Sequence, residues 1–150
     1  MAQFPVSTSR FGLGDNPQSF ATPLGHLAVA DKIGDGAPAG TVFKACRPTG
    51  EVLRADAPGR DPIVTRILRL RGLEPGNARA YGRCIYIHGT PVERLIGRPV
   101  SYGCIRMRSK DIVRVFESVP VGTRVQIVNA PLRGILKETA ARRGSALAAL

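Results

Sequence analysis

The 150-residue chain has no tryptophan, five phenylalanines, three tyrosines, two histidines and three cysteines. The shortage of aromatic side chains argues against an RNA-binding module that stacks bases. The cysteines stand far apart with no Cys-x-x-Cys pair, which argues against a disulfide-stapled scaffold or a zinc site. No apolar run approaches the roughly 20 residues that a membrane span needs. We therefore expect one domain that does not span a membrane and holds no metal or cofactor.

Acidic residues are few, 11 against 22 basic ones, which gives a formal net charge of +11. The basic residues are scattered with no run of four, so the charge alone does not indicate nucleic-acid binding. Twelve basic and four acidic residues fall between Arg60 and Arg114, the stretch that also holds the reactive side chains. Two interpretations fit this pattern: a cationic rim around a site for an anionic substrate, or a solvated basic surface.

Short β-type runs separated by turn residues predict a mainly β fold, a sandwich or barrel. The runs are Phe4 to Thr8, His26 to Ile33, Thr41 to Ala45, Ile63 to Leu70, Cys84 to His88 and Thr123 to Val128. The segment from Asp35 to Gly40 lacks the Gly-Lys-Ser/Thr sequence of a phosphate loop, so we expect it to connect a hairpin.

One principal short helix is expected from Ser109, the predicted N-cap, to the residues before Pro120. Its apolar stripe consists of Ile112, Val113, Phe116 and Val119. We predict a domain over residues 1–130 and assign no function to the Ala-rich tail over residues 131–150. The first six residues lack the charged and apolar regions of a secretory signal.

Two segments hold nearly every reactive side chain, Tyr86 to Thr90 and Ser101 to Met107. A cysteine attacks as a thiolate, so a neighbouring base or cation must lower its pKa from about 8.5. His88 can be that base for Cys104. Taken singly, a cysteine is more often a small buried hydrophobe and a histidine a structural polar residue. The other histidine, His26, is expected to be structural.

These motifs resemble the catalytic block of the YkuD-type L,D-transpeptidases. The resemblance is carried by His88-Gly89-Thr90, by Ser101-Tyr102-Gly103-Cys104-Ile105-Arg106-Met107 and by Val121-Gly122-Thr123-Arg124-Val125-Gln126-Ile127. It covers roughly residues 4 to 129 and implies a YkuD-like β-sandwich or barrel whose principal helix follows the catalytic cysteine. Two departures are visible. Tyr102 stands where the family usually has histidine, and the first strand, ahead of Pro5, is expected to be missing or incomplete.

The resemblance assigns roles to the motif residues. It implies that Cys104 is the nucleophile, that His88 is its base and that the Gly89 carbonyl orients the imidazole. The same resemblance assigns orientation and oxyanion binding to Ser101 and Gly103 as well, and substrate contact to Arg106 and Tyr102. It also implies that carbapenems acylate the nucleophile.

The activity implied is that of a peptidoglycan L,D-transpeptidase, which cross-links stem peptides by acyl transfer through a cysteine thioester. Its partners would be the donor tetrapeptide and an acceptor amine, with no nucleic acid; the oligomeric state stays open. An L,D-carboxypeptidase that trims muropeptides is one alternative. A wall-binding or basic nucleic-acid-binding module with a structural Cys104 is another. The cell envelope or periplasm is expected if the chain is a fragment of an exported protein, and the cytoplasm otherwise.

Overall fold

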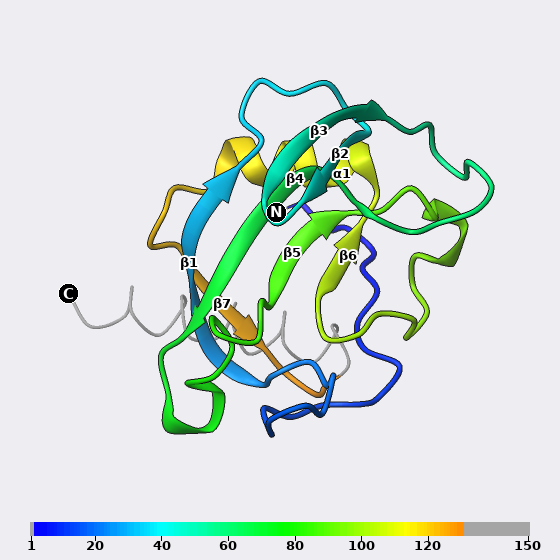
Figure 1. Ribbon diagram of the computed structural model, residues 1–150. Helices are drawn as coiled ribbons and strands as arrows, with labels where there is room; N and C mark the ends of the chain where they lie inside the picture. The colour runs from blue at the N-terminus through cyan, green and yellow to red at the C-terminus, as the bar shows by residue number, and fades with distance from the viewer. Residues whose placement is uncertain (1, 131–150) are drawn as a thin grey trace.

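The computed structural model describes residues 2–130, and these form a mainly β domain with a single α-helix, as expected (Figure 1). The strands are β1 (Gly25–Ile33), β2 (Thr41–Lys44), β3 (Arg47–Val52), β4 (Ile63–Gly72), β5 (Tyr86–Gly89), β6 (Ile105–Met107) and β7 (Arg124–Ile127). The helix is α1 (Ser109–Ser118), and two 3₁₀ turns are η1 (Pro75–Asn77) and η2 (Glu93–Leu95). The predicted tail over residues 131–150 lies outside the described residues.

All seven strands belong to one sheet, with β4 at its centre. β4 pairs antiparallel with β1, β2 and β5, and β1 pairs in turn with β7. The pairing of β5 with β6 is parallel, so the chain between them has to cross from one end of the pair to the other. That crossover carries η2 and ends at the cysteine motif.

The apolar core lies between one face of this sheet and α1, which Figure 1 shows behind the upper end of β4. Ile112 and Phe116 of the helix are buried there against sheet residues. The sheet residues of this core are Leu27, Val29, Leu68, Leu70, Ile105 and Met107. A smaller cluster of Phe43, Ile67 and Tyr86 lies apart from it. Since strand side chains alternate between faces, neighbouring residues of β4 and β5 contribute to different clusters.

Several local predictions are wrong. The segment from Phe4 to Thr8 forms no strand; it makes only an isolated bridge between Ser7 and Arg106. The segment from Asp35 to Gly40 connects no hairpin, since β1 and β2 each pair with β4 and not with one another. Strands β3 and β6 were not predicted at all. β3 offers no apolar alternation to detect, and β6 has three residues inside the cysteine motif.

The helix begins one residue earlier than the predicted cap allows, because Arg108 is the N-cap and Ser109 is already helical. The Ser109 amide donates instead to a carboxylate oxygen of Glu93 in η2, at 2.8 Å. A carboxylate at a helix N-terminus also interacts favourably with the helix dipole. Glu93 therefore fixes the start of α1 immediately after the reactive motif.

No helix among residues 2–130 has the length and apolar composition needed to cross a bilayer. Within the same range, no three His, Cys, Asp or Glu side chains gather closely enough to hold a metal ion.

Candidate active site

The parallel pairing of β5 with β6 brings the two reactive segments together. His88 is in register with Arg106, and Gly89 with Met107. Two positions before the His88–Arg106 pair, the Tyr86 amide donates to the Cys104 sulfur at 3.4 Å. Ile87 and Ile105 point into the helix-side core. By alternation, the side chains of His88, Cys104 and Arg106 share the opposite face of the sheet.

Cys104 is a protonated thiol in the resting structure. Its Sγ donates to the Cys84 carbonyl at 3.2 Å. Burial raises the pKa of the thiol to about 11, against the opposing effects of the Tyr86 amide and the Arg106 charge. The expectation that neighbouring groups lower this pKa is therefore wrong for the resting site, because desolvation of the thiolate outweighs them.

His88 is held as a neutral base. Its Nδ1 lies 2.8 Å from the Gly89 carbonyl oxygen, which can only accept, so Nδ1 carries the proton and Nε2 has a free lone pair. Burial lowers the pKa of His88 to about 4, with Arg106 acting in the same direction and the Gly89 and Asp61 contacts opposing. A Cβ at Gly89 would lie 2.5 Å from the Val64 carbonyl oxygen, so this position has no room for a side chain.

Asp61, in the loop before β4, connects both reactive segments. Its carboxylate forms an ion pair with Arg106 of β6. It also accepts a 2.6 Å hydrogen bond from the Thr90 hydroxyl, just after β5. These contacts hold the Arg106 guanidinium next to the strand that carries His88. Asp61 could not be selected from the sequence, because it stands in an irregular loop with no motif around it.

Ser101 and Gly103 shape the turn that presents Cys104. The Ser101 hydroxyl donates to the Cys104 carbonyl at 2.6 Å and accepts from the Gly103 amide at 3.2 Å. Gly103 has a φ of +120°, a conformation that favours glycine. The Thr22 hydroxyl donates to the Gly103 carbonyl at 2.9 Å and ties this turn to the N-terminal segment. Both residues thus act on the backbone that carries the thiol.

The other two cysteines lie close by. Cys46 Sγ donates to the Tyr86 hydroxyl at 3.6 Å, and Cys84 supplies the carbonyl that Cys104 contacts. Burial, together with hydrogen bonds from Cys84 and Cys46, raises the pKa of Tyr86 well above its usual value. Cys46 and Cys84 therefore contact the Tyr86 phenol, while Cys104 contacts the Tyr86 amide, a proximity that the sequence spacing did not indicate.

His26 lies outside this group, as expected. At the start of β1 its Nδ1 is 2.7 Å from Glu74, and its amide donates to the same carboxylate at 2.9 Å. These hydrogen bonds lower the pKa of Glu74. His26 therefore stabilises the contact between β1 and η1.

A cleft of about 820 Å³ adjoins the reactive face. Tyr102 and Arg106, on either side of Cys104 in the sequence, both line it. Arg10, Arg94 and Asp61 line it as well, which makes three arginines to one carboxylate. Such a charge balance favours anionic groups, in agreement with the first interpretation of the basic stretch.

Comparison with known proteins gives one consistent answer. The model of the YkuD family, described as L,D-transpeptidase catalytic domain, matches residues 1–127. The chain is 32% identical over 141 residues to Probable L,D-transpeptidase YcfS of Escherichia coli, which covers 91% of this chain and 42% of that protein. It is 46% identical over 61 residues to Probable L,D-transpeptidase YbiS of the same organism, covering 41% of this chain and 20% of that protein.

Solved structures share the fold. An L,D-transpeptidase from Mycobacterium tuberculosis superposes with a TM-score of 0.51 at 20% identity, over 84% of this chain and 42% of that one. L,D-transpeptidase 3 from the same organism, in complex with a faropenem-derived adduct, gives a TM-score of 0.50 at 21% identity, over 83% and 43% of the two chains. The chain thus spans less than half the length of these relatives. Since the family model matches most of it, the chain belongs to the YkuD family of L,D-transpeptidase catalytic domains.

Proposed function

We propose that residues 1–130 form the catalytic domain of a peptidoglycan L,D-transpeptidase of the bacterial cell envelope, with Cys104 as nucleophile and His88 as general base. The observation that carries this proposal is the β5–β6 register, which puts a thiol, an imidazole with a free Nε2 and a guanidinium on one face. Family membership supports the same reaction class.

Acylation begins when the Cys104 sulfur attacks the carbonyl carbon of the L,D-peptide bond ahead of the terminal D-alanine. His88 Nε2 takes the thiol proton as the C–S bond forms, and backbone amides of the Ser101–Cys104 turn stabilise the oxyanion. His88 then gives that proton to the D-alanine nitrogen as the C–N bond breaks. The resting pKa values, about 11 and about 4, mean that the proton moves only when the substrate is in place.

Deacylation reverses the roles. An acceptor amine attacks the thioester carbonyl, a new C–N bond forms and the C–S bond breaks. The amine proton passes through His88 to the departing sulfur, which restores the thiol. One amide bond is consumed and one is made, so the reaction needs no cofactor or energy source. Arg106, fixed by Asp61 at the cleft, is placed to contact a stem-peptide carboxylate.

A second candidate is L,D-carboxypeptidase activity, in which water replaces the amine. Tyr102 favours it, because this side chain is 57% exposed and packs on two phenylalanine rings where relatives usually carry an imidazole. A phenol has little basicity at neutral pH and cannot help to deprotonate an incoming amine. His88 is then the one base available to deprotonate the acceptor amine.

Mass spectrometry of the protein with a defined tetrapeptide, with and without an acceptor amine, tests the proposal. We expect the loss of D-alanine, cross-linked dimer when the amine is present, and no product with Cys104→Ala. Cys46→Ala and Cys84→Ala are the matched controls and should retain turnover. Equal loss in all three variants would contradict the assignment of Cys104.

A further inference from the structure

An exposed group of aromatic side chains adjoins the catalytic turn. Phe11, Phe20 and Tyr102, here called the aromatic patch, have ring centroids 5.3 to 5.9 Å apart. Their exposed fractions are 50%, 53% and 57%. The chain has only five phenylalanines and three tyrosines, so the patch contains three of its eight phenylalanine and tyrosine side chains. Aromatic rings contribute most when buried, and their exposure here calls for a binding partner.

The backbone under the patch is held in a costly conformation. Phe20 has a φ of +53°, which is rare for a bulky side chain. The Ser9 hydroxyl fixes it by donating to the Phe20 carbonyl at 2.6 Å, and it accepts from the Phe11 amide at 2.9 Å. One buried serine therefore holds the two phenylalanine-bearing segments together. Strained backbone that the surroundings enforce is typical of functional sites.

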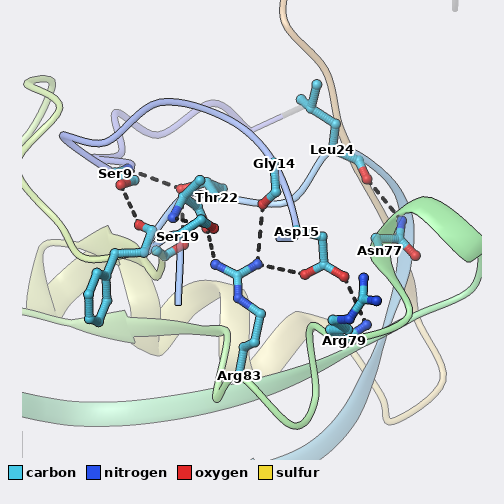
Figure 2. A network of polar contacts seen from close by, with 12 residues as sticks. Ser9, Gly14, Asp15, Ser19, Thr22, Leu24, Asn77, Arg79 and Arg83 are labelled. Carbon is cyan, nitrogen blue, oxygen red and sulfur yellow. Dashed lines mark hydrogen bonds and ion pairs between the residues drawn. The ribbon is translucent and has the colours of Figure 1, made fainter. Parts of the chain in front are cut away.

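A polar network anchors the same loop to the rest of the domain, as Figure 2 shows. Arg83 pairs with Asp15 at 2.6 Å, an almost fully buried contact, and also donates to the Gly14 and Ala21 carbonyls. Asp15 in turn accepts from the Arg79 amide at 2.8 Å. The Thr22 hydroxyl donates to the Gly103 carbonyl and so connects this loop to the Cys104 turn.

The distance from Cys104 to the aromatic patch can be compared with the length of a stem peptide. Tyr102 is two residues from Cys104, at most about 7 Å along the chain, and the Phe11 and Tyr102 ring centroids are 5.3 Å apart. In a donor stem, the attacked carbonyl belongs to the third residue, and the first is joined to a glycan sugar. Three extended residues span about 10 Å. A stem that runs from Cys104 past Tyr102 therefore brings its sugar over the patch.

We propose that the aromatic patch stacks the sugar ring to which the donor stem is attached, a role that rests on the proposed transpeptidase function. The C–H bonds on a pyranose face are polarised toward positive hydrogen and pack on the negative faces of aromatic rings. Arg10, whose guanidinium lies 5.7 Å from the Phe11 ring, forms no ion pair among residues 2–130 and is free to donate to a sugar carbonyl or carboxylate. The site thereby distinguishes glycan-linked stems from free peptides.

A lipid surface would use the same exposed rings, but the cleft argues against it. Tyr102 lines both the patch and the cleft that contains Arg106. A bilayer pressed against the patch would cover the cleft entrance and obstruct a polymeric substrate. A sugar ring on the patch instead continues the path of the stem peptide out of the cleft.

Binding measured by calorimetry in the Cys104→Ala background tests this proposal without any turnover. The ligands are a disaccharide-tetrapeptide and the same tetrapeptide without sugar. We expect the disaccharide ligand to bind about tenfold more tightly, the effect of one good aromatic contact. Adding Phe11→Ala and Phe20→Asn should reduce the ratio to within twofold; asparagine tolerates the left-handed backbone at position 20. Tyr81→Ala, an exposed aromatic outside the patch, should keep it.

Equal affinity of the Cys104→Ala protein for the two ligands would overturn the proposal, as would a ratio that survives the double change. Loss of binding to vesicles of phosphatidylglycerol in the double variant, with no sugar preference in its parent, would identify the patch as a membrane contact instead. The failure of the proposed function has a different signature. It is the absence of Cys104-dependent product in the turnover assay, whichever ligand binds.

Discussion

The two faces of the sheet are built from alternating residues of the same short strands and differ in almost every other property. On the helix side, Ile105 and Met107 of β6 are buried among aliphatic side chains. On the opposite side, Cys104 and Arg106 meet backbone groups, a carboxylate and a cleft. A register shift of one residue would exchange the two sets. The apolar face therefore fixes the position of the reactive one.

Removal of the proposed nucleophile should show most clearly that the reactive face contributes to activity and not to stability. Cys104→Ala is expected to lower turnover by at least about 10³-fold, since it removes the sulfur proposed to form the thioester. It should leave the melting temperature close to wild type because Cys104 is only half-buried. The assay is release of D-alanine from a tetrapeptide, alongside thermal unfolding. Unfolding of the variant would mean that the residue acts by packing.

The opposite result is expected on the helix side. Ile112→Ala removes a fully buried side chain from α1 and should lower the free energy of unfolding by about 2–5 kcal/mol. Turnover per folded molecule should stay within a few-fold of wild type. Urea unfolding with a parallel activity assay measures both. Val121→Ala, at an exposed position, is the control and should change neither. A catalytic loss without a stability loss would show that the faces are not independent.

Asp61 tests how the reactive face is held. Asp61→Asn breaks the ion pair to Arg106 and weakens the Thr90 contact, so we expect kcat/KM to fall by about tenfold. Glu51→Gln is the matched control, because Glu51 forms an exposed ion pair with Arg60, neither residue lines the cleft, and such pairs contribute little. Steady-state kinetics of both variants give the answer. Equal decreases of kcat/KM in the two variants would show that Arg106 does not need the Asp61 carboxylate for its role in the site.

The pH dependence follows from the two shifted groups. The pKa of His88 is lowered from 6.5 to about 4, so the stability it contributes is present above pH 6.5 and lost as the pH falls through about 4. The pKa of Cys104 is raised from 9.0 to about 11, so its contribution is present below pH 9 and lost as the pH rises through about 11. Urea unfolding across this range should show both losses.

His88→Gln should reduce the loss on the acid side, to which the lowered pKa of Glu74 also contributes, and leave the alkaline side unchanged. Cys104→Ala should reduce the loss on the alkaline side, to which the raised pKa of Tyr86 also contributes, and leave the acid side unchanged. The acid limb of kcat/KM in the wild type should likewise lie near pH 4, where the free base becomes protonated. An acid limb near pH 6.5 would indicate an exposed histidine and would contradict the burial of His88.

The smallest effect is expected at Tyr102, at the edge of the reactive face. Tyr102→His supplies a second imidazole near the thioester and should raise the ratio of cross-linked dimer to hydrolysed tripeptide by a few-fold. The ratio is measured for both proteins at equal acceptor concentration. If it does not change, position 102 does not control partitioning, and the preference has to come from the acceptor side of the cleft.

Much of this arrangement could be predicted from the sequence. The long central strand, the first strand of the sheet and the amphipathic helix have strong periodic patterns, and the His88 and Cys104 motifs are local. Strand β3 could not be found, because its residues are mostly exposed and include Pro48 and Gly50. Polar edge strands owe their structure to pairing and carry no alternating signal.

The parts of the site that were missed depend on distant contacts. Asp61 reaches Arg106 across 45 positions, and Cys46 reaches Tyr86 across 40. No local pattern encodes such pairs. The protonation of Cys104 was also predicted in the wrong direction. The sequence shows the charge of Arg106 nearby, but the degree of burial that outweighs it depends on the whole fold.

Covalent labelling with a carbapenem tests the central claim most directly, because its strained β-lactam carbonyl is expected to acylate the thiol that we propose attacks a donor stem. Trypsin places the three cysteines on separate peptides, residues 95–106 for Cys104, 84–94 for Cys84 and 45–54 for Cys46. We predict one adduct per chain, on the peptide of residues 95–106, and none with Cys104→Ala. An adduct on either other peptide, with residues 95–106 unmodified, would contradict the assignment of the nucleophile.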